Sequence, residues 1–326
     1  MRTALILNPT AGASQLSRQK MTEGELEAAL LQTLRSLDIE AEIYHTTLED
    51  PGLGIARQLV AEHIELIVAV GGDGTIHSVA HGLIGSESVL GIIPAGTMNN
   101  LAHCLGIPEE LEEACALLTN GEARYIDVGM INGHTFLEVA GIGLEAELFP
   151  AAEEVKSRGI LSTIKGVTSG LATLIRFRPP LMKVTFNGGK PRTYRAMQLT
   201  VCNSPYYGPH MSIAPDILMD DGWLDVVLYR NFSKREYIQH AISISQGRRT
   251  FTPKIIHRRV RSLRVSTNEI VEVQADGIIY GHTPAEISIR ANALKVQVPR
   301  ARVPGLLPAI REQITQKVKG KRRTYA

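Results

Sequence analysis

The sequence is poor in the features that mark secreted, membrane-spanning and nucleic-acid-binding proteins. Its 326 residues include three cysteines, none in a CxxC pair, so neither a zinc site nor a disulfide framework is indicated. No apolar run approaches the roughly 18 residues of a membrane-spanning helix. Aromatic residues make up 5% of the chain and are not interleaved with basic residues, which argues against a stacking platform for nucleic acid. We therefore expect a globular protein with buried thiols and no transmembrane segment.

Neither basic nor acidic residues predominate, because the formal net charge is only +2. Attraction to phosphate or anionic lipid must then come from local patches. Two basic clusters are present: Arg248, Arg249, Lys254, Arg258, Arg259, Arg261 and Arg264 form the first, and Lys317–Arg323 forms the second. Each is either solvated surface or a contact for an anionic membrane.

The first residues indicate a buried strand rather than a targeting signal. In MRTALILNPTAG the apolar run is broken by Asn8 and Pro9, which is too early for a signal peptide. We expect a cytoplasmic protein, at most peripheral to the inner face of a membrane. At roughly 150 residues per domain, the length of the chain predicts two domains.

The first third of the chain alternates continuous apolar runs with amphipathic stretches. The expected strands are Ala4–Leu7, Ile39–Tyr44, Leu66–Val70 and Val89–Ile93, and the expected helices are Glu25–Leu37, Gly54–His63 and His77–Leu83. Strands without alternation, interleaved with helices, are typical of a parallel sheet covered on both faces. Ligands of such sheets bind at the carboxyl ends of the strands.

From about Tyr125 the chain changes to short, β-rich runs separated by Gly, Asn or Pro. The expected strands are Tyr125–Ile131, Thr135–Val139, Leu181–Phe186, Thr193–Cys202, Leu224–Tyr229, Arg259–Val265, Ile270–Gln274 and Ala285–Arg290. Many of them alternate in character, which favours antiparallel pairing in a sheet-rich second domain. Two helices, Ala152–Ile175 and Ser233–Ser245, interrupt it, and the second opens with the Ser233 and Glu236 spacing of a capping box. An amphipathic tail from Pro304 predicts a final helix against the first domain.

The glycine-rich segment Gly71–Thr75 carries the strongest chemical signal. It lies between the apolar strand Leu66–Val70 and a helix that begins near Ile76. Glycines let backbone amides approach an anion closely, and the amides of the helix terminus face the same ligand. Asp73 is suited either to holding Mg²⁺, directly or through water, or to anchoring the loop.

Two further loops follow the ends of other strands. Asn8–Gly12 follows the first strand, and Pro94–Asn100 follows the strand Val89–Ile93. Each loop alone is compatible with a plain turn. Three such loops at the carboxyl ends of three strands indicate one nucleotide cleft.

In this order and spacing, NPTAG, GGDGT and PAGTMNN resemble the catalytic domain shared by diacylglycerol kinases, sphingosine kinases and bacterial lipid kinases. Later blocks match the same family: Asp127–Gly129, Ala140–Gly143, Asp220–Asp225 and Gln274–Gly277. The resemblance covers nearly the whole chain and is closest to the soluble bacterial members. It implies an α/β + β fold, in which a parallel-sheet ATP domain over residues 1–126, with a C-terminal return over 301–326, precedes an antiparallel β-sandwich over 127–300.

The resemblance also implies ATP-dependent transfer of a γ-phosphate to a lipid hydroxyl, with diacylglycerol as the default acceptor. Together with the three loops it places ATP on Asn8, Thr46, Gly71, Gly72, Asp73, Gly74, Thr75, Ile76, His77, Ser78, Gly96, Thr97 and Asn99. A structural Mg²⁺ site is implied on Asp221 and the backbone carbonyls of Leu218 and Trp223, an oxygen-only set that suits a hard cation. The alternative for Asp220–Gly222 is a plain β-turn. The catalytic candidates are Asp276 and Asp73.

Two positions depart from the family. Asn100 stands where the family usually has Asp, which is a mild change. Ile278 stands where the family has the Glu that takes the proton from the lipid hydroxyl, and isoleucine cannot accept a proton. Phosphoryl transfer relies mainly on positioning and charge stabilisation, while a general base contributes roughly 10²–10⁴-fold. Asp276 remains as a base or metal ligand, so a slow kinase, a kinase with a relocated base and a dead nucleotide- or lipid-binding homologue stay open.

Other functions find less support in the sequence. NAD kinases also carry a GGDGT loop, but the NPTAG and GTMNN blocks and Asp276-Gly277 favour the lipid side. His77, His81, His103 and His134 lack the spacing of a metal site, and no GxSxG elbow of a hydrolase occurs. The expected partner is a lipid substrate at a membrane surface rather than nucleic acid, and a homodimer stays open.

Overall fold

The computed structural model describes residues 2–11, 23–144, 146–147, 168–170, 172–207, 211–212, 216–245 and 253–300. Several expectations lie outside the described residues: Gly12, most of the helix Ala152–Ile175, Arg248 and Arg249, and the tail 301–326 with its helix and basic cluster.

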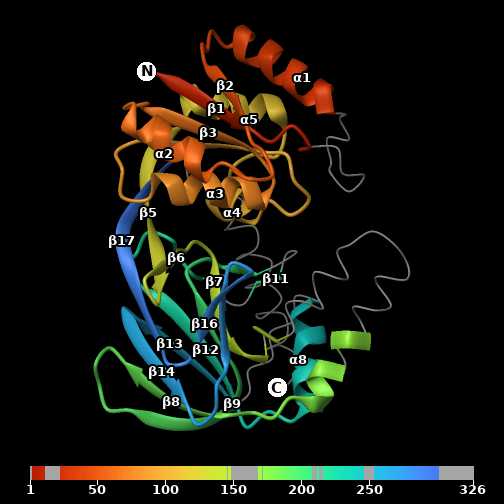
Figure 1. The fold of residues 1–326 in the computed structure, drawn as a ribbon, viewed down its shortest axis with the longest axis vertical. Helices are drawn as coiled ribbons and strands as arrows, with labels where there is room; N and C mark the ends of the chain where they lie inside the picture. Colours follow the sequence, from red (N-terminus) through yellow and green to blue (C-terminus); the bar gives the residue numbers. More distant parts are fainter. Residues whose placement is uncertain are drawn as a thin grey trace, which may run out of the picture.

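The first domain is built on four parallel strands. They are β1 (Thr3–Leu7), β2 (Glu42–His45), β3 (Leu66–Gly71) and β4 (Val89–Pro94), in the order β4-β3-β1-β2. The helices are α1 (Glu23–Ser36), α2 (Leu53–Ala61), α3 (Asp73–Leu83), α4 (Asn100–Leu105) and α5 (Leu111–Asn120). In Figure 1, α2, α3 and α4 lie on the side of the sheet that faces the second domain, and α1 lies on the other side.

Alternate side chains of the same strands fill two separate cores. On β3, Ile67 and Ala69 pack with α2 and α3, whereas Val68 and Val70 pack with α1 and α5. Every residue of β3 is buried, which explains why its sequence is a continuous apolar run. The expected parallel sheet covered on both faces is confirmed.

The second domain is antiparallel throughout its described strand pairs. Its strands are β5 (Glu122–Ile131), β6 (His134–Phe136), β7 (Val139–Gly143), β8 (Leu181–Phe186), β9 (Arg192–Cys202), β12 (Leu224–Arg230), β13 (Ile255–Val260), β14 (Ser262–Thr267), β15 (Glu272–Ala275), β16 (Ile278–His282) and β17 (Ala285–Val298), with the small pair β10 (Tyr206–Tyr207) and β11 (Met211–Ser212). Side chains from both layers, including Phe136, Leu199 and Leu263, share one core. This is a β-sandwich, as expected, with the helix α8 (Lys234–Ser245) on its outside.

The longest strand joins the two domains. β17 pairs in parallel with β4 through Lys295 and Val296, and it pairs antiparallel with β5 and β14. Figure 1 shows it running from the first domain into the second. The predicted boundary between residues 126 and 127 falls inside β5, which pairs with β17 on both sides of that point. The exact division of the domains stays a prediction.

Three expected strands differ in detail, and one expected helix start is confirmed. Thr135–Val139 is not one strand, because residues 137 and 138 separate β6 from β7. Arg259–Val265 is likewise divided at Arg261 between β13 and β14. β17 continues eight residues beyond the predicted end at Arg290, to Val298. The capping box is confirmed: Ser233 Oγ accepts the amide of Glu236 at 3.3 Å, and Glu236 Oε2 accepts the amide of Ser233 at 2.8 Å.

Candidate functional site

The glycine-rich segment forms the turn between β3 and α3, but α3 begins at Asp73, earlier than the predicted start near Ile76. β3 ends at Gly71, and α3 begins at Asp73 after the extended residue Gly72. A Cβ on Gly96 would lie 2.5 Å from Cα of Gly72, so the loops after β3 and β4 touch backbone to backbone. A Cβ on Gly74, in contrast, would meet nothing within 4 Å. Packing therefore requires glycine at Gly96, but not at Gly74.

The loops after β3 and β4 form a glycine cradle, and Asn8 connects the loop after β1 to it. Its Nδ2 donates to Thr75 Oγ1 at 3.2 Å, and its Oδ1 accepts the amide and the hydroxyl of Thr10 at 3.0 and 2.9 Å. Thr46, which is buried, donates its amide to the carbonyl of Leu7 at 2.9 Å. The structure thus brings the loops that follow four strands to one edge of the sheet.

Asp73 anchors the loop after β4. Its carboxylate accepts the amides of Asn99 at 3.0 Å and Asn100 at 2.7 Å. Asn99 has a left-handed backbone with φ 50°, and its side-chain amide exchanges hydrogen bonds with the N–H and C=O of Gly96. Of the two roles that the sequence allowed for Asp73, this geometry supports the anchor.

The other residues predicted to bind ATP lie in three different environments. The side chain of Ile76 is fully buried in the core between α3 and the sheet, so only its backbone is available to a ligand. Thr97 is exposed beside the cradle. His77 and Ser78 lie further along α3, on the side of the second domain.

A cluster of titratable side chains joins α3 to the second domain. His77 Nε2 lies 2.9 Å from Glu138 Oε1, and His77 Nδ1 lies 3.8 Å from Asp276 Oδ2. Side-chain exposure is 16% for His77, 10% for Glu138 and 5% for Asp276. One turn along α3, His81 Nδ1 lies 2.7 Å from Thr135 Oγ1.

Asp276 holds the segment between β6 and β7. It occupies a left-handed turn with φ 46°, and its carboxylate accepts the amides of Leu137, Glu138 and Val139 at 2.6, 3.0 and 3.0 Å. Both oxygens are therefore engaged by backbone groups. The predicted role of Asp276 as a base or metal ligand stays a prediction, and the geometry adds a structural role.

The side chains of this cluster have pKa values shifted by burial and by one another's charges. Burial by itself lowers the pKa of His77, but the hydrogen bond to Glu138 and the charges of Asp276, Glu138 and Asp73 outweigh it and raise that pKa from 6.5 to about 9. Burial raises the pKa of Glu138, and burial lowers the pKa of His81. The acidic neighbours therefore favour the protonated form of His77.

Glu138 was not among the residues singled out from the sequence. A signal for it existed, because it is the one charged residue in the apolar run from Phe136 to Ala140. A charged side chain in such a run is seldom buried unless it is paired. Its partner His77 lies 61 positions earlier, and no local pattern connects the two.

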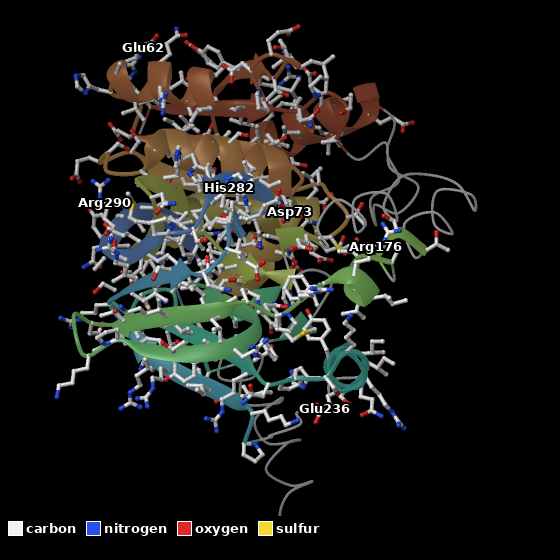
Figure 2. All side chains as sticks on the ribbon, turned by 60° about the horizontal axis from the view of Figure 1, so that its bottom comes forward. Glu62, Asp73, Arg176, Glu236, His282 and Arg290 are labelled. Atoms are coloured by element: carbon white, nitrogen blue, oxygen red, sulfur yellow. The ribbon has the colours of Figure 1, made fainter. Side chains whose placement is uncertain are left out.

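A cleft of about 820 Å³ opens beside this cluster, between α2 and α3 on one side and β6, β16 and β17 on the other. Ser78 and Ile278 line this cleft, and Ile278 is 56% exposed. The stacked rings of His134 and Tyr280, 4.5 Å apart at 23°, form part of its wall. Figure 2 shows Asp73 where the first domain meets the second. The volume lies within the roughly 300–1,000 Å³ of small-molecule sites.

The predicted metal residues form a tight turn in the second domain. Asp221 Oδ1 accepts the amide of Trp223 at 3.0 Å, and its carboxylate pairs with the guanidinium of Arg259. Asp127 Oδ2 accepts the amide of Gly222 at 2.6 Å. Among the described residues no group of three or more His, Cys, Asp and Glu side chains is arranged for a metal ion. A cation on Asp221 and on the carbonyls of Leu218 and Trp223 would compete with Arg259, so this Mg²⁺ site stays a prediction.

Known families match both domains. Residues 2–131 match the sequence model of the diacylglycerol kinase catalytic domain, and residues 139–298 match that of the YegS C-terminal NAD kinase beta sandwich-like domain. The diacylglycerol kinase of Bacillus subtilis strain 168 is 28% identical over 303 residues, covering 92% of this chain and 97% of that protein. A diacylglycerol kinase of Staphylococcus aureus strain RF122 is 24% identical over 288 residues, covering 87% and 88%.

A solved structure supports the same relationship. A Bacillus anthracis protein assigned to the diacylglycerol kinases superimposes with a TM-score of 0.73 at 26% identity, covering 91% of this chain and 96% of that one. The two domains and their order therefore define the class of two-domain kinases with an α/β catalytic domain and a β-sandwich. Within that class, this chain belongs to the diacylglycerol kinase family. None of the described helices is long and apolar enough to span a bilayer.

Proposed function

We propose that this protein is an ATP-dependent lipid kinase that transfers the γ-phosphate of ATP to a hydroxyl of diacylglycerol or a related lipid. The observation that carries the proposal is the glycine cradle, in which the loops after β1, β3 and β4 are joined at one edge of the sheet. The match to diacylglycerol kinases over both domains supports the acceptor class.

ATP phosphates fit the amide-rich start of α3. The first amides of a helix have no partner within the helix and attract anions. Gly74 lies in this first turn, and the space that a Cβ would take there is open. Since neither packing nor a left-handed backbone requires glycine at Gly74, a ligand that approaches the backbone supplies the reason. Thr97 and Asn99 border the same place, and the nucleoside extends along α3 towards the cleft that Ser78 lines.

Mg²⁺ belongs to the proposal through ATP. An ion bound with ATP would supply positive charge against the phosphates. The chain itself positions the phosphates, because Asp73 fixes the loop after β4 and Asn8 fixes Thr75. A second, structural Mg²⁺ on Asp221 requires the guanidinium of Arg259 to move away from the carboxylate.

A lipid acceptor implies contact with a membrane, and one face of the second domain suits it. Lys234 at the start of α8 donates to the carbonyl of Ile175, so α8 and the segment that ends near Ile175 are adjacent. The exposed apolar side chains of these two segments are Ile175, Ile238 and Ile242, and their exposed basic side chains are Arg176 and Arg235. An apolar and basic surface of this kind suits an anionic bilayer.

The experiment measures phosphate transfer from ATP with Mg²⁺ to mixed micelles of diacylglycerol, monoacylglycerol, phosphatidylglycerol, sphingosine or ceramide, and to NAD. Gly74→Ala is the test variant. Gly24→Ala is the matched control, because Gly24 also lies in the first turn of a helix with open space around a Cβ. We expect lipid-dependent turnover that Gly74→Ala abolishes and Gly24→Ala retains.

Two other results would select the alternatives. Phosphorylation of NAD but of no lipid would identify an NAD-kinase-like enzyme. Tight ATP binding without turnover on any acceptor would identify a nucleotide- or lipid-binding homologue, the alternative that Ile278 favours.

A further inference from the structure

The proposed reaction needs a group that takes the hydroxyl proton, and two obvious positions do not supply one. Ile278 has no acceptor atom, and its side chain only lines the cleft. Asp276 already accepts three backbone amides with its two oxygens. Withdrawing it from these bonds would leave three amides of the β6–β7 segment without a partner, which is costly for buried groups.

Glu138 is free of both obstacles. Its backbone is clamped, because its carbonyl accepts the amides of Asn203 and Ser204 at 2.8 and 3.2 Å. Its Oε1 lies 2.9 Å from His77 Nε2. Within the part of the chain that the structure describes, no hydrogen bond is formed by Oε2. This oxygen is nevertheless not completely enclosed by protein atoms. One carboxylate oxygen is therefore held by His77, and the other is left for an incoming hydroxyl, although the side chain as a whole is only 10% exposed.

The position of Glu138 relative to the cradle is set by one helix. Asp73 and His77 are four residues apart on α3, so their side chains lie on the same face, one turn apart. Asp73 fixes the phosphate cradle, and His77 fixes Glu138. The same helix therefore carries both the residue that fixes the cradle and the residue that fixes the carboxylate.

We propose that Glu138 accepts the proton of the lipid hydroxyl in place of the carboxylate missing at position 278, with His77 as its positioning residue. This inference rests on the proposed kinase function. In the step, the hydroxyl O–H bond breaks and its proton goes to Glu138. The oxygen forms a bond to the γ-phosphorus, the bond from that phosphorus to the bridging oxygen breaks, and ADP leaves with those electrons. Glu138 later returns the proton to solvent.

The groups around Glu138 tune it for this role. Burial and the carboxylates of Asp276 and Asp73 raise its pKa, and the hydrogen bond and positive charge of His77 oppose that rise. A base works best when its pKa lies near the working pH rather than far below it. His77 also keeps one oxygen fixed, so that the carboxylate does not rotate away from the acceptor.

The test replaces Glu138 by its isostere. Glu138→Gln should lower kcat by roughly 10²–10⁴-fold, the usual contribution of a general base, while the Kd for ATP stays unchanged. Glu138→Gln with Ile278→Glu should recover part of the lost rate, because it restores a carboxylate at the family position. Glu272→Gln, a half-buried glutamate on β15, is the matched control and should keep the wild-type rate.

His77→Gln separates positioning from mere support of the fold. Loss of the cation disfavours the ionised form of Glu138, so the acidic limb of the pH profile of kcat should move to higher pH. An active wild-type chain whose Glu138→Gln variant keeps kcat within threefold, or loses ATP binding, would overturn the base assignment alone. A wild-type chain inactive on every lipid would overturn the kinase function and this inference with it.

Discussion

At the scale of single residues, glycines in the same cradle are required for different reasons. A Cβ on Gly96 would lie 2.5 Å from Cα of Gly72 and 2.8 Å from Asn99 Oδ1, both of which are fixed. A Cβ on Gly74 would enter open space. Gly96 therefore serves the packing of the protein itself, whereas Gly74 leaves room for a ligand.

This difference predicts opposite effects of two alanine substitutions. Gly96→Ala should lower the free energy of unfolding by about 1–3 kcal/mol, the usual cost of overpacking. Gly74→Ala should leave it unchanged or raise it by up to about 1 kcal/mol, because alanine is the better helix former. Urea unfolding measures the stability, and titration with ATP measures binding, which Gly74→Ala should weaken. Equal stability of the two variants would contradict this account of the cradle.

At the scale of elements, α8 offers a direct test of membrane contact. Ile238 and Ile242 are 39% and 51% exposed on this helix. Replacing both by serine should lower the fraction of protein that sediments with phosphatidylglycerol vesicles several-fold, since apolar burial contributes about 25 cal/mol per Å². The affinity for ATP measured without vesicles should not change, because the cradle belongs to the other domain.

The matched control for α8 is Leu48→Ser. Leu48 is 100% exposed, but it lies in the loop after β2 in the first domain. Its substitution should leave vesicle binding as it is. Equal binding of the α8 variant and the wild-type chain would place the membrane contact elsewhere.

The elements also show how far the sequence alone could lead. The strands β1, β3 and β4 were predictable because burial on both faces makes them continuous apolar runs. The α5 helix was missed although Leu111, Ala114, Cys115 and Leu118 have helical spacing. The division between β6 and β7 was not predictable, because it depends on Asp276, 137–139 positions later in the chain.

The candidate site shows the same limit. The three loops of the cradle were predictable, since each follows its own strand in a parallel sheet. Asp73 and its amide partners lie 26 and 27 positions apart, so the anchor role was one of two alternatives until the contact was seen. The pairing of His77 with Glu138 joins two domains and leaves no local pattern.

At the scale of the whole molecule, two kinds of contact hold the domains together. β5 and β17 form an antiparallel pair on both sides of an irregularity between Arg290 and Leu294, and the buried Asp127 secures it by accepting the amides of Asn292 on β17 and Gly222. The second contact runs from α3, through His77 to Glu138 and His81 to Thr135. The first is backbone pairing that does not titrate, whereas the second depends on protonation.

The α3 contact therefore predicts how stability depends on pH. The pKa of His77 is raised from 6.5 to about 9, so its contribution is fully present below pH 6.5 and is lost as the pH rises through 9. At about 1.4 kcal/mol per pKa unit, the free energy of unfolding should fall by up to about 3 kcal/mol over this window. The lowered pKa of His81 acts in the opposite direction, but only below pH 6.5.

Urea unfolding between pH 6.5 and 9 should show this decline in the free energy of unfolding of the wild-type chain, and a smaller decline in His77→Gln. His45→Gln removes a half-exposed histidine that also contacts a glutamate, Glu27, and should keep the wild-type slope. Equal slopes in all three proteins would mean that the protonation of His77 contributes nothing to the stability of the junction.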